Sequence, residues 1–205
     1  MISASHNPFY DNGIKLINAA GEKMKEDVIS EIEKYLDGEM GEIPYATREK
    51  IGCTVDYTAG RNRYMGYLMS LAIYSFKGIR VGLDASNGSA WTLAKAVFDA
   101  LGAKTYVINA APDGTNINEN CGSTHIEGLQ DLVRREHLDV GFAFDGDADR
   151  CLCVDEKGNV RAYGSIVTQE GDLMKLEPIT TEKEWKVIEM ALNVIQEQTK
   201  NEEDK

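Results

Sequence analysis

Short apolar runs alternate with helical patterns between residues 79 and 144, and this alternation restricts the fold more than any other feature of the sequence. The runs at 79–83, 105–108 and 140–144 have the length and composition of buried strands. Helical patterns at 91–101 and 129–135 separate them. The sequence therefore predicts an α/β fold with a mixed, largely parallel sheet flanked by helices. Ligands of such a sheet bind at the carboxyl ends of its strands.

The first forty residues carry a weaker pattern of their own. A short strand is predicted at 13–17, and a helix with apolar side chains recurring from Val28 to Leu36 ends at Gly38. The residues ahead of Ser5 leave no room for a preceding strand. We therefore expect strand 13–17 to lack a partner within the chain, and an unpaired strand is not independently stable.

The rest of the chain divides into three further segments. Residues 41–59 have mixed charge and no clear period, which is typical of a linker. Residues 60–161 hold the α/β unit, which opens with a helical pattern at 64–74. Residues 162–205 are predicted to form a helical tail, because 182–198 place an apolar stripe on one face. Such a face favours self-association or the covering of an exposed sheet edge.

Composition excludes several classes of partner. The 34 acidic and 22 basic residues give a formal charge of −12, which disfavours binding to nucleic acid. No apolar run reaches the roughly 18 residues that span a membrane, and the two residues before Ser3 predict no export signal. The four cysteines contain no Cys-x-x-Cys pair, which favours reduced thiols. We expect a cytoplasmic protein that acts on a small molecule.

The strongest chemical signal is Asp145-Gly-Asp147-Ala-Asp149-Arg150, directly after the apolar run at 140–144. Three carboxylates separated only by small residues can converge on one cation. Oxygen ligands without histidine or cysteine favour Mg²⁺ or Ca²⁺ over zinc. Arg150 is suited to bind a phosphate oxygen beside such a metal. A solvated acidic turn is the alternative, but the position after a buried strand favours a metal site.

Two other acidic motifs fit less well. A helix–loop–helix calcium site requires glycine at the sixth position of its loop, where this sequence has Arg150, and the flanking segments here are strands. Phosphatases of the haloacid-dehalogenase type place a threonine or valine two residues after the second aspartate. That place is occupied by Asp149, which makes more sense as a third ligand.

Ser5 and His6 lie in a turn-forming segment near the start of the chain. Ten residues after Ser5, Lys15 lies on the predicted strand and can approach the serine if the segment folds back. On these residues alone a surface turn and a solvated lysine are the ordinary interpretations. His125 has no acidic or cysteine partner at ligand spacing and is interpreted as structural.

Taken together, these motifs resemble the α-D-phosphohexomutase family. The resemblance rests on residues 4–8 (Ala-Ser-His-Asn-Pro), 11–15 (Asp-Asn-Gly-Ile-Lys) and the Asp145 motif, in that order and spacing. Residues 113–118 (Asp-Gly-Thr-Asn-Ile-Asn) and 121–125 (Cys-Gly-Ser-Thr-His) are similar to the phosphoglucosamine mutase branch of that family. The resemblance covers about residues 1–161 and implies that 1–40 form the end of a first domain and 60–161 a second domain.

The resemblance also implies a reaction. Ser5 would carry a phosphoryl group and, through a phosphate oxygen, share a Mg²⁺ ion with the three aspartates of the Asp145 motif. Lys15 and His6 would handle the proton of the attacking sugar hydroxyl, and Arg150 would steady the phosphoryl group. The substrate would be a hexose or hexosamine phosphate, with transfer between C6 and C1. Such a reaction depends on positioning and charge neutralisation.

Two motifs of the family are absent from this sequence: a sugar-binding Glu-Ser-Gly-His-like loop and a phosphate-binding Arg-x-Ser-Gly-Thr loop. Most of the first domain's sheet is also absent. We therefore expect this chain alone to be weakly active or inactive. The alternative is a non-catalytic module that binds Mg²⁺ or a partner through surfaces that other domains cover in the family.

Overall fold

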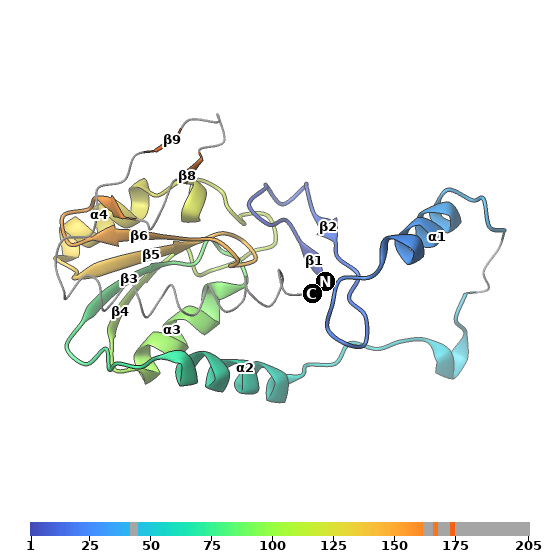
Figure 1. The fold of residues 1–205 in the computed structure, drawn as a ribbon, viewed down its shortest axis with the longest axis horizontal. Helices are drawn as coiled ribbons and strands as arrows, with labels where there is room; N and C mark the ends of the chain where they lie inside the picture. Colours follow the sequence, from blue (N-terminus) through green and yellow to red (C-terminus); the bar gives the residue numbers. More distant parts are fainter. Residues whose placement is uncertain (42–44, 162–165, 168–172, 175–205) are drawn as a thin grey trace.

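The computed structural model describes residues 1–41, 45–161, 166–167 and 173–174 (Figure 1). Its centre is a five-stranded sheet in the order β4 (Lys104–Ile108), β3 (Arg80–Asp84), β5 (Val140–Phe144), β6 (Cys151–Asp155) and β7 (Val160–Arg161). The pairs β3–β4 and β3–β5 are parallel, and β5–β6 and β6–β7 are antiparallel. The sheet is therefore mixed, with its parallel part formed by the three strands that the sequence predicts.

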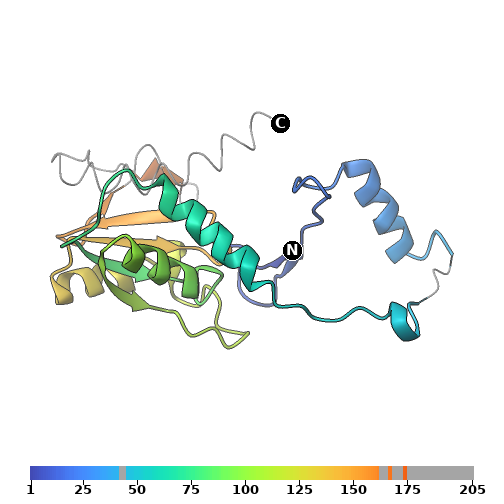
Figure 2. The same cartoon turned by 90° about the horizontal axis from the view of Figure 1, so that it is seen from below.

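Helices cover both faces of this sheet. Helices α2 (Thr58–Leu71) and α3 (Ala90–Ala100) lie on one face, and α4 (Glu127–Glu136) lies on the other (Figures 1 and 2). Alternate residues of β5 point to opposite faces, so Phe142 packs in the core on the α3 side while Ala143 packs on the α4 side. Two apolar cores result. Cys153 belongs to the first of them.

The order of the strands creates a topological switch point. From β3 the chain passes through α3 to β4 on one side, and then through α4 to β5 on the other side of β3. The connection that follows β3 and the connection that follows β5 therefore leave in opposite directions, at the carboxyl ends of these two neighbouring strands. Binding sites of open α/β sheets form at such points. The loop after β5 is the acidic motif predicted from the sequence.

The N-terminal part of the chain differs from the prediction. Strand β2 (Gly13–Ile14) is shorter than the predicted 13–17, and it pairs antiparallel with a second short strand, β1 (Ile2–Ser3). The prediction that no strand precedes it was wrong, because two residues are enough to form the pairing. The N-terminal ammonium group adds a hydrogen bond to the carbonyl oxygen of Lys15 at 2.7 Å.

Helix α1 (Glu26–Leu36) confirms the predicted helix and lies at the end of the molecule away from the five-stranded sheet (Figure 1). Its last residue is Leu36, and Gly38, the predicted stop, follows two residues later with a φ of +80°. Its apolar side chains Val28, Ile32 and Leu36 are exposed. The predicted linker that follows contains a short 3₁₀ helix, η1 (Arg48–Lys50).

Further differences lie at the ends of elements. Helix α2 begins at Thr58 and ends at Leu71, whereas the sequence pattern places it at 64–74. Strands β8 (Ile166–Val167) and β9 (Leu173–Met174) pair with each other inside the segment predicted as a helical tail. The predicted helix at 182–198 lies outside the described residues. None of the helices in the described part of the chain is long and apolar enough to span a bilayer.

Candidate active site

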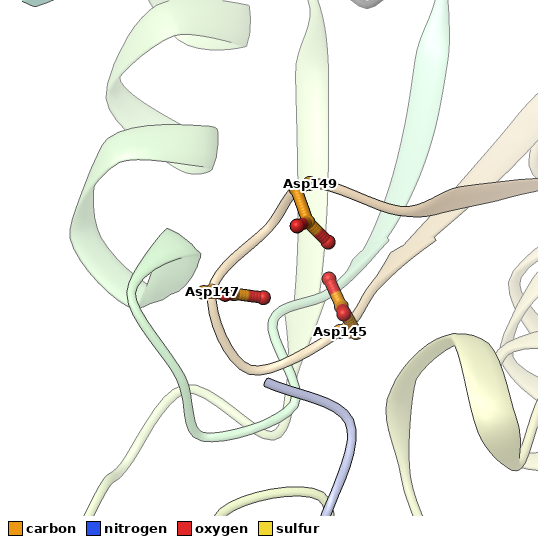
Figure 3. A group of neighbouring side chains, drawn as sticks. All are labelled: Asp145, Asp147 and Asp149. Atoms are coloured by element: carbon orange, nitrogen blue, oxygen red, sulfur yellow. The ribbon is translucent and has the colours of Figure 1, made fainter. Parts of the chain in front are cut away.

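The acid loop, residues 145–150, connects β5 to β6 and gathers three carboxylates. Ligand oxygens of Asp145, Asp147 and Asp149 all lie within 4.8 Å of one another. Figure 3 shows the three side chains pointing toward a common centre. The loop closes on itself, since the amide of Arg150 donates to Asp145 Oδ1 at 3.1 Å and the amide of Ala148 donates to the Asp145 carbonyl oxygen at 3.1 Å.

The electrostatics of the acid loop fit a hard cation. Asp145 Oδ2 and Asp147 Oδ1 are buried and have no hydrogen-bond partner among the described residues. Burial, together with the charges of the neighbouring aspartates, raises the pKa of Asp145 well above its ordinary value. Buried carboxylate oxygens without donors are costly unless a cation neutralises them. The donor set is oxygen only, which fits Mg²⁺.

The serine segment, residues 3–8, docks directly against the acid loop. The carbonyl oxygen of Ser5 accepts a hydrogen bond from the amide of Gly146 at 3.0 Å. The same oxygen accepts a second bond from Asn118 Nδ2 at 2.8 Å. Ser5 has a φ of 52°, which turns the segment sharply at this residue. Two motifs from opposite ends of residues 1–161 therefore lie side by side.

Lys15 reaches the same site from the residue after β2. Its Nζ lies 3.1 Å from Asp147 Oδ2. The hydrogen bond and charge of Asp147 raise the pKa of Lys15. Burial alone would raise the pKa of Asp147, but bonds from Lys15 and Ser3 outweigh it and lower that pKa. The sequence suggested an approach of Lys15 to Ser5, and the structure shows an ion pair of Lys15 with the acid loop.

The two remaining predicted residues lie at the edges of the site. The Arg150 side chain is half exposed, and its Nε is 4.0 Å from Asp145 Oδ2. His6 lines a cavity of about 460 Å³ between the serine segment and the loop after β4, and its Nδ1 is buried without a partner among the described residues. His125, interpreted above as structural, lines the same cavity.

Sequence reasoning missed a buried polar group behind the acid loop. Asp84, the last residue of β3, is fully buried, and its carboxylate accepts the amides of Ser86 at 3.0 Å and Gly122 at 2.9 Å. Ser86 in turn donates its hydroxyl to the carbonyl oxygen of Phe144, the residue before the acid loop. The available signal was an aspartate at the carboxyl end of an apolar strand, the same signal that identifies Asp145.

The contact between the two motifs leaves no room for a side chain at Gly146. A Cβ atom there would lie 2.4 Å from the Ser5 carbonyl oxygen and 2.8 Å from Ile117 Cδ1. We expect Gly146→Ala to displace the serine segment and to speed amide exchange of Asn7 by roughly tenfold, because the Gly146–Ser5 hydrogen bond breaks. Gly66→Ala, at a position with open space, is the control. Unchanged exchange in Gly146→Ala would contradict the observed docking.

Comparison with known proteins agrees with this arrangement. Residues 62–158 match the family model described as phosphoglucomutase/phosphomannomutase, alpha/beta/alpha domain II. Residues 1–41 match the model of alpha/beta/alpha domain I of the same family. The two matches together cover about two-thirds of the chain; the first contains the acid loop and the second contains the serine segment.

Individual relatives point the same way. Phosphoglucosamine mutase of Lachnospira eligens is 91% identical over 175 residues, which are 85% of this chain and 39% of that protein. Phosphoglucosamine mutase of Lachnoclostridium phytofermentans is 63% identical over 175 residues, which are again 85% of this chain and 39% of that protein. The chain thus spans about two-fifths of the length of these relatives.

A solved structure supports the fold. The phosphoglucomutase/phosphomannomutase family protein of Burkholderia thailandensis superposes with a TM-score of 0.58 at 28% identity, over 78% of this chain and 33% of that chain. It therefore shares the mixed α/β arrangement that places the acid loop at the carboxyl end of β5. On the two family models and these identities, the chain belongs to the phosphoglucomutase/phosphomannomutase family, the α-D-phosphohexomutases.

Proposed function

We propose that the chain supplies the phosphoserine and metal loops of a cytoplasmic, phosphoglucosamine mutase-like enzyme. Such an enzyme moves a phosphoryl group between C6 and C1 of a hexose or hexosamine phosphate. The observation that carries this proposal is the docking of Ser5 on the acid loop, through the hydrogen bond from the Gly146 amide to the Ser5 carbonyl oxygen at 3.0 Å. The names of the two curated relatives support the choice of substrate class.

Each residue then has a distinct task. A hydroxyl oxygen of the sugar attacks the phosphorus of phospho-Ser5, the bond from phosphorus to Ser5 Oγ breaks, and the hydroxyl proton leaves to a base. His6 and Lys15 are the candidates for that base; Lys15 takes the proton only as the free amine, and its ion pair with Asp147 favours the ammonium form. In the reverse transfer, Ser5 Oγ attacks the phosphorus of the other phosphate of the sugar bisphosphate, and the bond from that phosphorus to the sugar oxygen breaks. The Ser5 hydroxyl proton leaves to a base, and the departing sugar oxygen takes up a proton. Arg150, half exposed beside the acid loop, is placed to bind a phosphate oxygen.

Asp145, Asp147 and Asp149 would hold Mg²⁺, with a phosphate oxygen on Ser5 as a further ligand. The ion, when bound, neutralises charge on the phosphoryl group. The fit rests on the two buried carboxylate oxygens without partners, described above. Lys15 contributes a positive charge beside the same carboxylates.

The first test is phosphate on Ser5. The purified chain is incubated with glucose 1,6-bisphosphate and Mg²⁺, and its phosphorylation is located by mass spectrometry. We expect phosphate on Ser5 and a drop in incorporation of at least about a thousandfold in Ser5→Ala, because no other nucleophile takes its place. Ser70→Ala, which removes an exposed hydroxyl on α2, is the control and should incorporate phosphate normally.

The alternative function makes a different prediction in the same experiment. A non-catalytic module would bind Mg²⁺ at the acid loop but take up no phosphate on Ser5. Equal incorporation in the wild-type chain and Ser5→Ala would also refute the proposed role of Ser5. A coupled mutase assay with glucosamine and glucose phosphates then measures whether the chain completes a full turnover.

A further inference from the structure

A single buried asparagine connects the serine segment to the sheet. Asn118 is 7% exposed and lies in the loop between β4 and the 3₁₀ helix η2 (Gly122–Thr124). Its Nδ2 donates to the carbonyl oxygens of Ser5 and Asn7, both at 2.8 Å. These contacts join residues more than a hundred positions apart in the chain, and both acceptors lie in the serine segment.

Asn118 is itself held by the loop that follows β3, and through this loop it is connected to β5. The main-chain amide of Asn118 donates to the carbonyl oxygen of Ser86 at 2.9 Å, and Ser86 lies in the loop after β3. The Ser86 hydroxyl donates to the carbonyl oxygen of Phe144, the last residue of β5. A continuous series of hydrogen bonds therefore runs from Ser5 through Asn118 to the residue that precedes Asp145.

The chemistry of the side chain suits this position. A primary amide offers two N–H groups from one nitrogen, which matches two carbonyl acceptors. Asparagine also tolerates the left-handed backbone conformation that this residue adopts, with a φ of 58°. Aspartate has the same shape but presents only acceptors, so it would face the two carbonyl oxygens with negative charge.

We propose that Asn118 is a positioning residue of the phosphoryl-transfer site. It fixes the backbone of Ser5 against the acid loop, so that the serine and the three carboxylates keep one mutual arrangement. The inference rests on the proposed function of Ser5. Asn118 holds main-chain oxygens of Ser5 and Asn7, and it acts on the reaction through the serine segment.

The first experiment measures whether Asn118 holds the serine segment. Asn118→Gly removes the side chain and keeps the left-handed backbone, whereas Asn118→Asp keeps the shape and removes the donors. In both variants the amides of Asn7 and Gly146 should exchange with solvent at least roughly tenfold faster, because two hydrogen bonds are lost. Asn120→Gly is the matched control, since Asn120 has a φ of 49° and is exposed.

The second experiment separates positioning from stability. Phosphorylation of Ser5 by glucose 1,6-bisphosphate is followed at saturating Mg²⁺, with donor concentration varied. We expect both Asn118 variants to lower the maximal rate by roughly tenfold or more. The donor concentration at half-maximal rate and the Mg²⁺ affinity measured by calorimetry should stay within about twofold of the wild type. The Tm should stay within a few degrees of the wild type.

Three results would overturn the inference: unchanged amide exchange in the Asn118 variants, faster exchange with an unchanged rate of phosphorylation, or a rate loss that merely follows losses of Tm and Mg²⁺ affinity. Failure of the proposed function gives a different pattern. The wild-type chain would then take up no phosphate on Ser5, and the proposed role of Asn118 in phosphoryl transfer would also be refuted. The exchange data would still report whether Asn118 holds the serine segment.

Discussion

Replacing Asp145 by asparagine is expected to weaken Mg²⁺ binding by at least about a hundredfold, because the acid loop loses one of its three anionic ligands. The substitution keeps the shape of the side chain and the acceptor for the Arg150 amide. Calorimetric titration of the purified chain with MgCl₂ measures the effect. Asp131→Asn is the control, since Asp131 is an exposed aspartate on α4 that pairs with Arg134.

The same substitution should have the opposite effect on stability. Asp145 is fully buried beside Asp147 and Asp149, so its charge opposes folding when no cation is bound. In EDTA we expect Asp145→Asn to unfold with a free energy about 1 kcal/mol higher than that of the wild type. Wild-type Mg²⁺ affinity in this variant would show that the ion binds elsewhere. A large loss of stability in EDTA would show instead that the carboxylate is mainly structural.

The second large effect is expected at Gly122. This residue has a φ of +73°, and a Cβ atom would lie 1.9 Å from Ser86 Oγ and 2.4 Å from the Phe144 carbonyl oxygen. Both atoms belong to the buried hydrogen-bond network behind the acid loop. Gly122→Ala should therefore lower the free energy of unfolding by about 3 kcal/mol or more, from backbone strain and overpacking together. Thermal unfolding followed by circular dichroism should show a Tm lower by roughly 10 °C.

Gly114→Ala separates the two causes. Gly114 also has a left-handed backbone, with a φ of +94°, but no atom lies within 4 Å of its Cβ position. Its substitution should cost only about 1 kcal/mol, the backbone contribution alone. If both variants lose the same amount, the close packing of Gly122 against Ser86 contributes nothing measurable.

The sheet could be predicted from the sequence because its signal is local. Strands β3, β4 and β5 are short apolar runs between helical patterns, and their observed bounds lie within about a residue of the predicted ones. Helix α2 was less well placed. None of its residues is buried. The regular spacing of apolar residues that marks a helix packed against a core is therefore weak in its sequence.

The acid loop could also be predicted, since small residues between Asp145, Asp147 and Asp149 leave few other arrangements. The long-range part of the site could not. Asn118 lies in a loop with a left-handed backbone and reaches a residue 113 positions away, and the spacing of residues along the sequence does not indicate such a contact. The sequence suggested that Lys15 approaches Ser5, but only the fold shows its ion pair with Asp147.

The attachment of Ser5 uses its main chain alone. Its amide donates to Ser3 Oγ at 2.9 Å, and its carbonyl oxygen accepts from Gly146 and Asn118. Within the described residues, its hydroxyl takes no part in this anchoring. The side chain at position 5 can therefore exchange a hydroxyl for a phosphate, or be replaced by cysteine, while the same three hydrogen bonds persist. The chain holds residue 5 with one set of atoms and leaves another set for chemistry.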